Sequence, residues 1–137
     1  MQLTPLIAVH MTAALLALVT GPVALWARKG RTQRTRLHRA FGYAWVAFML
    51  LTALSALLIR DHRLPNVAGF TPIHLLIPLT LGALFLALRA LVRGQVQQHR
   101  QTMQRLYFSA CVVTGMFTLW PSRLLGQWLW HDALGWW

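Results

Sequence analysis

Acidic residues are almost absent from this chain. Two of its 137 residues are acidic, Asp61 and Asp132, and none is glutamate, whereas thirteen are lysine or arginine. Both aspartates also fall outside the long apolar runs. This scarcity excludes catalysis by paired carboxylates, a carboxylate-bridged di-iron centre and a Ser-His-Asp relay.

Cysteine is equally scarce. Cys111 is the only one, so no internal disulfide can form. Histidines are then the main candidates for metal ligands. A structural zinc site is disfavoured, because no two of His10, His38, His74 and His99 are spaced i, i+4 on one helix. Copper stays open through histidine and methionine, with Met49 and Met103 as candidates.

Apolar residues dominate what is present. The chain is 57% hydrophobic and 11% charged, and its mean hydropathy is +0.51. Soluble domains carry roughly 25% charged residues. The apolar residues fall in blocks of about 20, the length that crosses a bilayer as a helix. The composition therefore predicts an integral membrane protein.

The positive charge is concentrated in two places. Of the thirteen basic residues, six lie between Arg28 and Arg39 and four between Arg89 and Arg105, in segments that join apolar runs. Such placement predicts two cytoplasmic loops that contact anionic lipid headgroups, and it argues against a nucleic-acid partner. The uncharged residues 1–4 lack the basic start of a cleavable signal, so we expect the first run to remain as a spanning helix.

The runs predict an all-α membrane fold with four spanning helices, at about 5–26, 37–59, 71–88 and 96–120, and with both termini outside. Two prolines should disturb them. Pro22 cannot bond the carbonyl of Leu18, and Pro78 cannot bond that of His74. Each freed carbonyl needs another partner in a dry environment. The tail 122–137 holds four of the seven tryptophans and should lie in the membrane interface.

A repeat organises these helices. His10 is followed after 20 residues by Gly30, and His74 after 20 residues by Gly94, each glycine within a basic cluster. The next apolar runs open with His38-Arg39 and His99-Arg100. The pattern indicates two tandem two-helix units, about 5–59 and 70–121, within a single membrane domain. Two parallel repeats predict a four-helix bundle with a pseudo-twofold axis along the membrane normal.

The four repeat histidines are the candidate site. His10 with His74 should lie near the outer surface and His38 with His99 near the inner one, about 25–30 Å apart. Ionisable residues at membrane depth are functional candidates by default. Two facing imidazoles without thiolate or carboxylate suit bis-histidine haem b, whose iron they would ligate. The propionates could meet three arginines, namely Arg39 and Arg100 inside and Arg123 outside. Interhelical hydrogen bonds or ordinary interfacial positions would explain the same histidines.

Several motifs also carry a resemblance. They are Gly21-Pro22, Arg28-Lys29-Gly30, residues 37–43 (LHRAFGY), residues 69–74 (GFTPIH), and His99-Arg100 with Met103 and Tyr107. They resemble a bacterial family of small predicted membrane proteins that is labelled a domain of unknown function. This resemblance implies a four-helix membrane protein and no settled activity. The histidine layout is separately similar to that of transmembrane di-haem b-type cytochromes of the cytochrome b561 type, which implies electron transfer between two haems.

The leading functional prediction is a multi-pass haem b protein of the bacterial inner membrane. It would bind one or two haems and act as an electron-transfer component linked to a quinol, with no catalytic residue of its own. If one haem binds, we expect the outer pair, His10 and His74, to hold it. Two alternatives stay open: a non-catalytic membrane subunit or assembly factor with structural histidines, in a homo- or hetero-oligomer, and a carrier of copper or zinc.

Overall fold

The first helix begins and ends where the sequence predicts. A computed structural model of the chain describes residues 4–28, 33–60, 67, 72–120 and 123–135, and its helix α1 spans Pro5–Trp26. Thr4 caps it, since the side-chain oxygen accepts a hydrogen bond from the Ile7 amide at 3.3 Å. Pro5 occupies the first turn, where its missing amide costs nothing.

The next two helices show how proline changes the start of a helix. Helix α2 spans Thr35–Leu58, two residues earlier than predicted at its start. The third helix opens with a 3-10 turn, η1 (Pro72–Leu75), and continues as α3 (Leu76–Val92). Pro78 has no amide hydrogen to donate to the His74 carbonyl. The regular α-helical hydrogen bonds therefore begin after His74, later than the expected start at residue 71.

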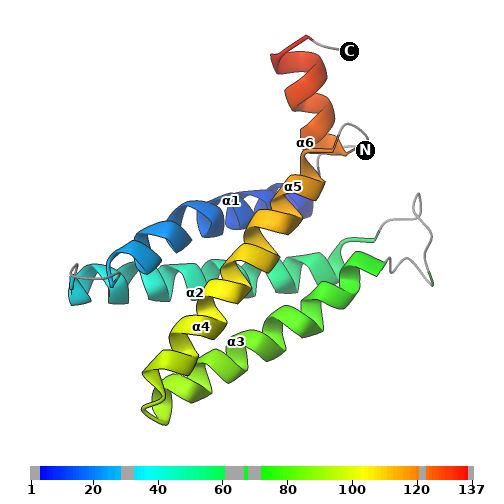
Figure 1. Cartoon of the computed structure of the whole chain (residues 1–137). Helices are drawn as coiled ribbons and strands as arrows, with labels where there is room; N and C mark the ends of the chain where they lie inside the picture. Colours follow the sequence, from blue (N-terminus) through cyan, green and yellow to red (C-terminus); the bar gives the residue numbers. More distant parts are fainter. Residues whose placement is uncertain (1–3, 29–32, 61–66, 68–71, 121–122, 136–137) are drawn as a thin grey trace.

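The fourth helix is continuous but not uniform. It starts at Val96 as predicted, with α4 (Val96–Leu106), passes through a π-helical segment, η2 (Tyr107–Val113), and ends as α5 (Thr114–Thr118). Nothing in the apolar pattern indicated the π-helical segment. The tail forms α6 (Leu124–Gln127) and a second π-helical segment, η3 (Trp128–Ala133), which project beyond the hairpins (Figure 1). The Trp130 indole donates to the Leu119 carbonyl at 2.9 Å and ties the tail to the end of α5.

The described helices are arranged as two antiparallel hairpins. Helices α1 and α2 run side by side in the first hairpin, and α3 pairs with α4 in the second (Figure 1). The hairpins cross at an angle and meet near their middles, whereas their turns lie apart. This splayed arrangement differs from the compact bundle expected, because the second hairpin packs on the first over a short stretch only.

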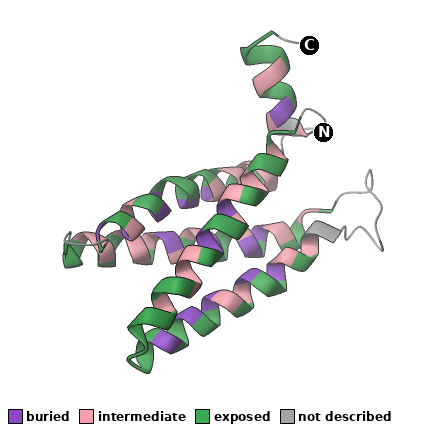
Figure 2. Ribbon diagram, in the orientation of Figure 1, coloured by how far each residue is buried: buried purple, intermediate pink, exposed green. Residues whose placement is uncertain are grey.

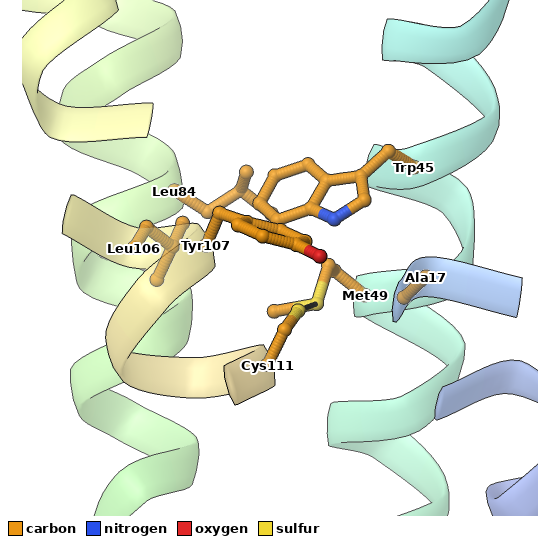
Figure 3. Packing of buried hydrophobic residues seen from close by; sticks show 7 residues of the cluster. All are labelled: Ala17, Trp45, Met49, Leu84, Leu106, Tyr107 and Cys111. Atoms are coloured by element: carbon orange, nitrogen blue, oxygen red, sulfur yellow. Dashed lines mark hydrogen bonds between the residues drawn. The ribbon is translucent and has the colours of Figure 1, made fainter. Parts of the chain in front are cut away.

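Burial follows the crossing. The buried positions lie on the facing sides of the helices, and the outer sides are exposed along their length (Figure 2). A cluster of buried residues joins all four helices at the crossing (Figure 3): Ala17, Trp45, Met49, Leu84, Leu106, Tyr107 and Cys111. This cluster holds the two hairpins together and sets the separation of their ends.

The exposed outer surfaces are strongly apolar. Helices α1 and α2 are each long and apolar enough to cross a membrane, and α3 is a shorter apolar helix of 17 residues. Large apolar side chains such as Val19, Leu58 and Leu79 are each at least 65% exposed. In water such a surface would be unstable, but against lipid it costs nothing. Four crossings with both termini outside stay a prediction.

Candidate functional site

His10 sits on the face of α1 that packs against α2. It is half-buried, and its Nδ1 lies 3.1 Å from the Thr52 carbonyl oxygen and 3.0 Å from Ser55 Oγ. A carbonyl can only accept, so Nδ1 carries the proton and Nε2 keeps its lone pair. Ser55 is held in turn by its own bond to the Leu51 carbonyl at 2.7 Å. The ring is therefore fixed in one orientation and one tautomer.

His74 reaches the same helix from the other hairpin. Its Nε2 donates to the carbonyl of Ile59, at the end of α2, over 3.0 Å. The carbonyls of Thr52 and Ile59 are seven residues apart, or about 10 Å along the helix axis. The two predicted outer histidines thus converge on the last two turns of α2, but each ring is directed at the main chain and not at the other ring.

His38 and His99 make the same contact in both hairpins. His38 Nδ1 donates to the Ala24 carbonyl of α1 at 2.7 Å, and His99 Nδ1 donates to the Ala87 carbonyl of α3 at 2.9 Å. In each case the histidine near the start of the second helix bonds a carbonyl near the end of the first. The two contacts are alike, and in each hairpin the imidazole acts as a clasp beside the turn.

The structure does not bring the two inner histidines together. His38 belongs to the α1–α2 hairpin and His99 to the α3–α4 hairpin, and the turns of these hairpins lie apart (Figure 1). Each imidazole forms its hydrogen bond within its own hairpin. A haem shared by this pair would need the turns to approach one another.

The centre of the fold holds a contact that joins the hairpins. The Tyr107 hydroxyl donates to the Leu18 carbonyl at 2.9 Å. This is the carbonyl that Pro22 leaves without its helical amide. Gly21 makes the approach possible, because a Cβ at that position would clash with the Tyr107 ring. The π-helical segment carries Tyr107 and Cys111, and both are buried in the central cluster.

The sulfur atoms form a second central contact. Cys111 Sγ donates to Met49 Sδ at 3.6 Å, and both side chains are buried (Figure 3). Met103 packs against the edge of the same cluster. Within the described residues no group of three or more His, Cys, Asp or Glu could hold a metal ion. The four repeat histidines bond to main-chain carbonyls away from this sulfur cluster.

The predicted propionate arginines are placed at three separate points. Arg39 is exposed at the start of α2, where it lines an open hollow with Arg36 and Tyr43. Arg100 is exposed on the first turns of α4. Arg123 is half-buried where the tail begins, and its amide donates to the Trp120 carbonyl at 2.8 Å. A contact of these arginines with haem propionates stays a prediction.

Sequence reasoning missed the partners of these side chains. It predicted that the Leu18 carbonyl would need a donor, but it did not name Tyr107. It also left Ala24 and Ala87 unassigned, because an alanine carbonyl carries no signal in the sequence. The proline positions were the usable signal: each marks a carbonyl that some side chain or backbone group must satisfy.

Comparisons with known proteins address the family and little more. No curated protein and no solved structure matches the chain. The likeness to cytochrome b561-type proteins therefore rests on the histidine pattern alone. One family model, described as a predicted membrane protein (DUF2306), matches residues 7–135, which is nearly the whole chain. Together with the apolar helices, this match shows that the chain belongs to the DUF2306 family of predicted membrane proteins.

Proposed function

We propose that the protein binds a b-type haem at the open end of its hairpins, with His10 and His74 as the axial ligands. The observation that carries this proposal is the convergence of these two imidazoles, from separate hairpins, on the last two turns of α2. In the predicted orientation this end lies at the outer surface of the bacterial inner membrane, with all four helices crossing it.

The donor set fits haem in two respects. Two imidazoles come from two different hairpins, and apolar side chains are exposed nearby, namely Leu58 at the end of α2 and Leu75 next to His74 in sequence. The Nδ1–H bond of His10 to a main-chain carbonyl is the usual support of an iron-ligating histidine, because it leaves Nε2 for the metal. Ligation through Nε2 of His74 would replace its bond to the Ile59 carbonyl.

Haem b held by two imidazoles supplies reversible one-electron transfer. The chain itself would orient the ligand rings, keep water from them and balance the propionate charge with Arg123. The proposal covers the outer pair only, since His38 and His99 are clasps within separate hairpins. A quinol is the electron donor we favour, because the site faces a lipid phase.

The test is the visible spectrum of the detergent-purified full chain, expressed with ample haem, before and after dithionite reduction. We expect a Soret band with reduced α and β bands that His10→Ala or His74→Ala abolishes. His131→Ala is the matched control, since His131 is exposed in the tail. His38→Ala should leave the spectrum unchanged. A folded, monodisperse and colourless protein would rule the proposal out.

The second candidate is a non-catalytic membrane subunit or assembly factor. One observation favours it: all four repeat histidines already donate to main-chain carbonyls, as structural histidines should. Under this reading the protein is colourless, and His10→Ala lowers only the melting temperature. Stable co-purification with one partner protein would then distinguish a subunit from an isolated membrane protein. A metal carrier is the least favoured reading, because the described residues hold no group of three or more His, Cys, Asp or Glu that could bind a metal ion.

A further inference from the structure

An open hollow lies at the start of α2, close to the turn of the first hairpin. Its volume is about 450 Å³, and it is lined by Thr35, Arg36, Arg39, Ala40 and Tyr43. All five residues belong to the first three turns of one helix and are exposed. We call this feature the Arg36 hollow. It is distinct from the four repeat histidines, and His38 beside it faces α1 instead.

The Arg36 hollow carries positive charge without a carboxylate from its own hairpin turn. The two acidic residues of the chain are Asp61, which follows the opposite end of α2 in sequence, and Asp132, in the tail. The N-terminus of α2 has no side-chain cap and no acidic residue in its first turn. The nearby Arg34 guanidinium lies over the Trp26 ring at 5.5 Å. An anion for Arg36 and Arg39 must therefore come from another molecule.

Beyond the arginines the same face of α2 is apolar. Tyr43 is 72% exposed, and Leu50 and Leu54, which lie seven and eleven residues further along, are 40% and 54% exposed. These spacings keep all three on one side of the helix. The exposed stripe thus begins with two guanidinium groups near the turn and continues as an apolar track toward the middle of the molecule. A ligand that covers it must be anionic at one end and apolar at the other.

The second hairpin also has a hollow beside its turn, mainly on the last turns of its first helix, α3. It is smaller, about 140 Å³, and is lined by Leu86, Arg89, Ala90, Arg93, Gln95 and Gln98 beside the turn at Gly94. It also has two arginines next to an exposed leucine, Leu86. The repeat therefore places an arginine-lined hollow next to each turn. Both turns are predicted to lie at the same membrane face, which suits a ligand of the membrane itself.

We propose that the Arg36 hollow is a binding site for an anionic phospholipid. Arg36 and Arg39 bind the phosphate of the headgroup, as guanidinium groups do with good geometry. Tyr43 packs against the glycerol and upper acyl region, and the track through Leu50 and Leu54 contacts the acyl chain. The smaller hollow at Arg89 and Arg93 is a weaker site of the same kind. This inference does not depend on haem, so either can fail alone.

The experiment uses native mass spectrometry of the delipidated full chain in detergent, titrated with phosphatidylglycerol or with phosphatidylcholine. We expect phosphatidylglycerol to bind the wild type more tightly than phosphatidylcholine. The double variant Arg36→Gln/Arg39→Gln should weaken phosphatidylglycerol binding about 30-fold, as two lost guanidinium contacts near a membrane surface imply. The matched control is Arg28→Gln/Arg105→Gln, which removes the same charge from exposed residues outside both hollows.

The outcomes separate a built site from general charge. Equal weakening by both double variants would overturn the proposal, because net charge alone would then explain lipid retention. Displacement of the lipid by inorganic phosphate would also overturn it, in favour of a site for free anions. Tyr43→Ala provides a check that leaves the charge unchanged: it should weaken phosphatidylglycerol binding several-fold, and an unchanged affinity would contradict the track along α2.

Discussion

The two hairpins share one clasp but are packed differently. In both, a histidine near the start of the second helix bonds an alanine carbonyl near the end of the first, at 2.7 Å for His38 and 2.9 Å for His99. The buried face of the first hairpin's leading helix is made of small residues: Ala13, Ala17, Thr20, Gly21 and Ala24. That of the second has Ile77, Thr80 and Leu84 before Ala87 and Ala90.

This difference explains the splayed shape. Small residues let α1 lie close to α2 along its whole length, as small-xxx-small spacing does in membrane helices. In the second hairpin the larger Ile77 and Leu84 are buried before the alanines of the turn end, and α3 and α4 diverge away from the turn (Figure 1). Both hairpins therefore have the clasp beside the turn. They differ in the packing along their length.

The hairpins also differ at their open ends, away from the turns. His10 bonds α2 within its own hairpin, whereas His74 bonds the end of α2 in the other hairpin. The two histidines occupy like positions in their hairpins, but both bond to α2. A site that uses both imidazoles can therefore form only at the C-terminal end of α2.

The largest effect should come from filling the space at Gly21. Gly21→Ala places a Cβ against the Tyr107 ring and should destabilise the protein by about 3 kcal/mol, at the upper end of overpacking costs. The measurement is the thermal unfolding midpoint in detergent. Gly82→Ala, in the leading helix of the other hairpin, is the control. Nothing lies within 4 Å of a Cβ there, so it should gain about 0.5–1 kcal/mol. Similar shifts in both variants would contradict the close approach.

Removing the Tyr107 hydroxyl should have the next largest effect. Tyr107→Phe leaves the Leu18 carbonyl without a partner and should cost about 2 kcal/mol. Pro22→Ala restores the amide that can bond this carbonyl within α1. The cost of Tyr107→Phe should therefore shrink in the Pro22→Ala background, as a double-mutant cycle of unfolding free energies would show. Additive costs would mean that the hydroxyl does not serve the carbonyl.

The clasps offer a direct comparison of the hairpins. His38→Ala and His99→Ala should each cost about 1 kcal/mol, and the two costs should be similar because the bonds are equivalent. Denaturant unfolding of the two variants measures this. Gln97→Ala, at an exposed position of α4, should be neutral. Clearly unequal costs would show that the two contacts differ in energy despite their shared geometry.

The smallest effect should be at the start of α1. Thr4→Ala removes the cap bond to the Ile7 amide, which at 3.3 Å is long and exposed, and should cost about 0.5 kcal/mol. Thr4→Ser keeps a hydroxyl and should cost less. Hydrogen exchange of the amides in the first turn of α1 would report this fraying locally, and unchanged protection in Thr4→Ala would show that the cap is not used.

Much of the secondary structure could be predicted, and the reasons are local. Pro5 and Trp26 bound α1 as expected, and Val96 starts the fourth helix, since proline position and apolar run length are properties of short stretches. The π-helical segment at Tyr107–Val113 could not be predicted. Its local sequence is ordinary, and it carries Tyr107 and Cys111, whose buried contacts are made with residues of the other hairpin.

The candidate residues were named from the sequence, and their role as a site stays a prediction. The four histidines were chosen by their spacing, and His38 and His99 make like contacts in the two hairpins. The main-chain acceptors of these imidazoles could not be predicted, because spacing places a histidine at a level in the membrane without giving its direction. Iron ligation and the propionate contacts stay predictions.

The sequence by itself determined the membrane class and the bounds of α1, because each depends on composition and on signals within one segment, whereas α2 starts two residues earlier and α3 ends four residues later than predicted. It also marked the Leu18 carbonyl as unsatisfied through Pro22. Only the tertiary structure decided which donor reaches that carbonyl, how the hairpins cross and where each imidazole points. Those outcomes depend on contacts between helices that are distant in sequence, and small residues such as Gly21 control them by a few ångströms of approach.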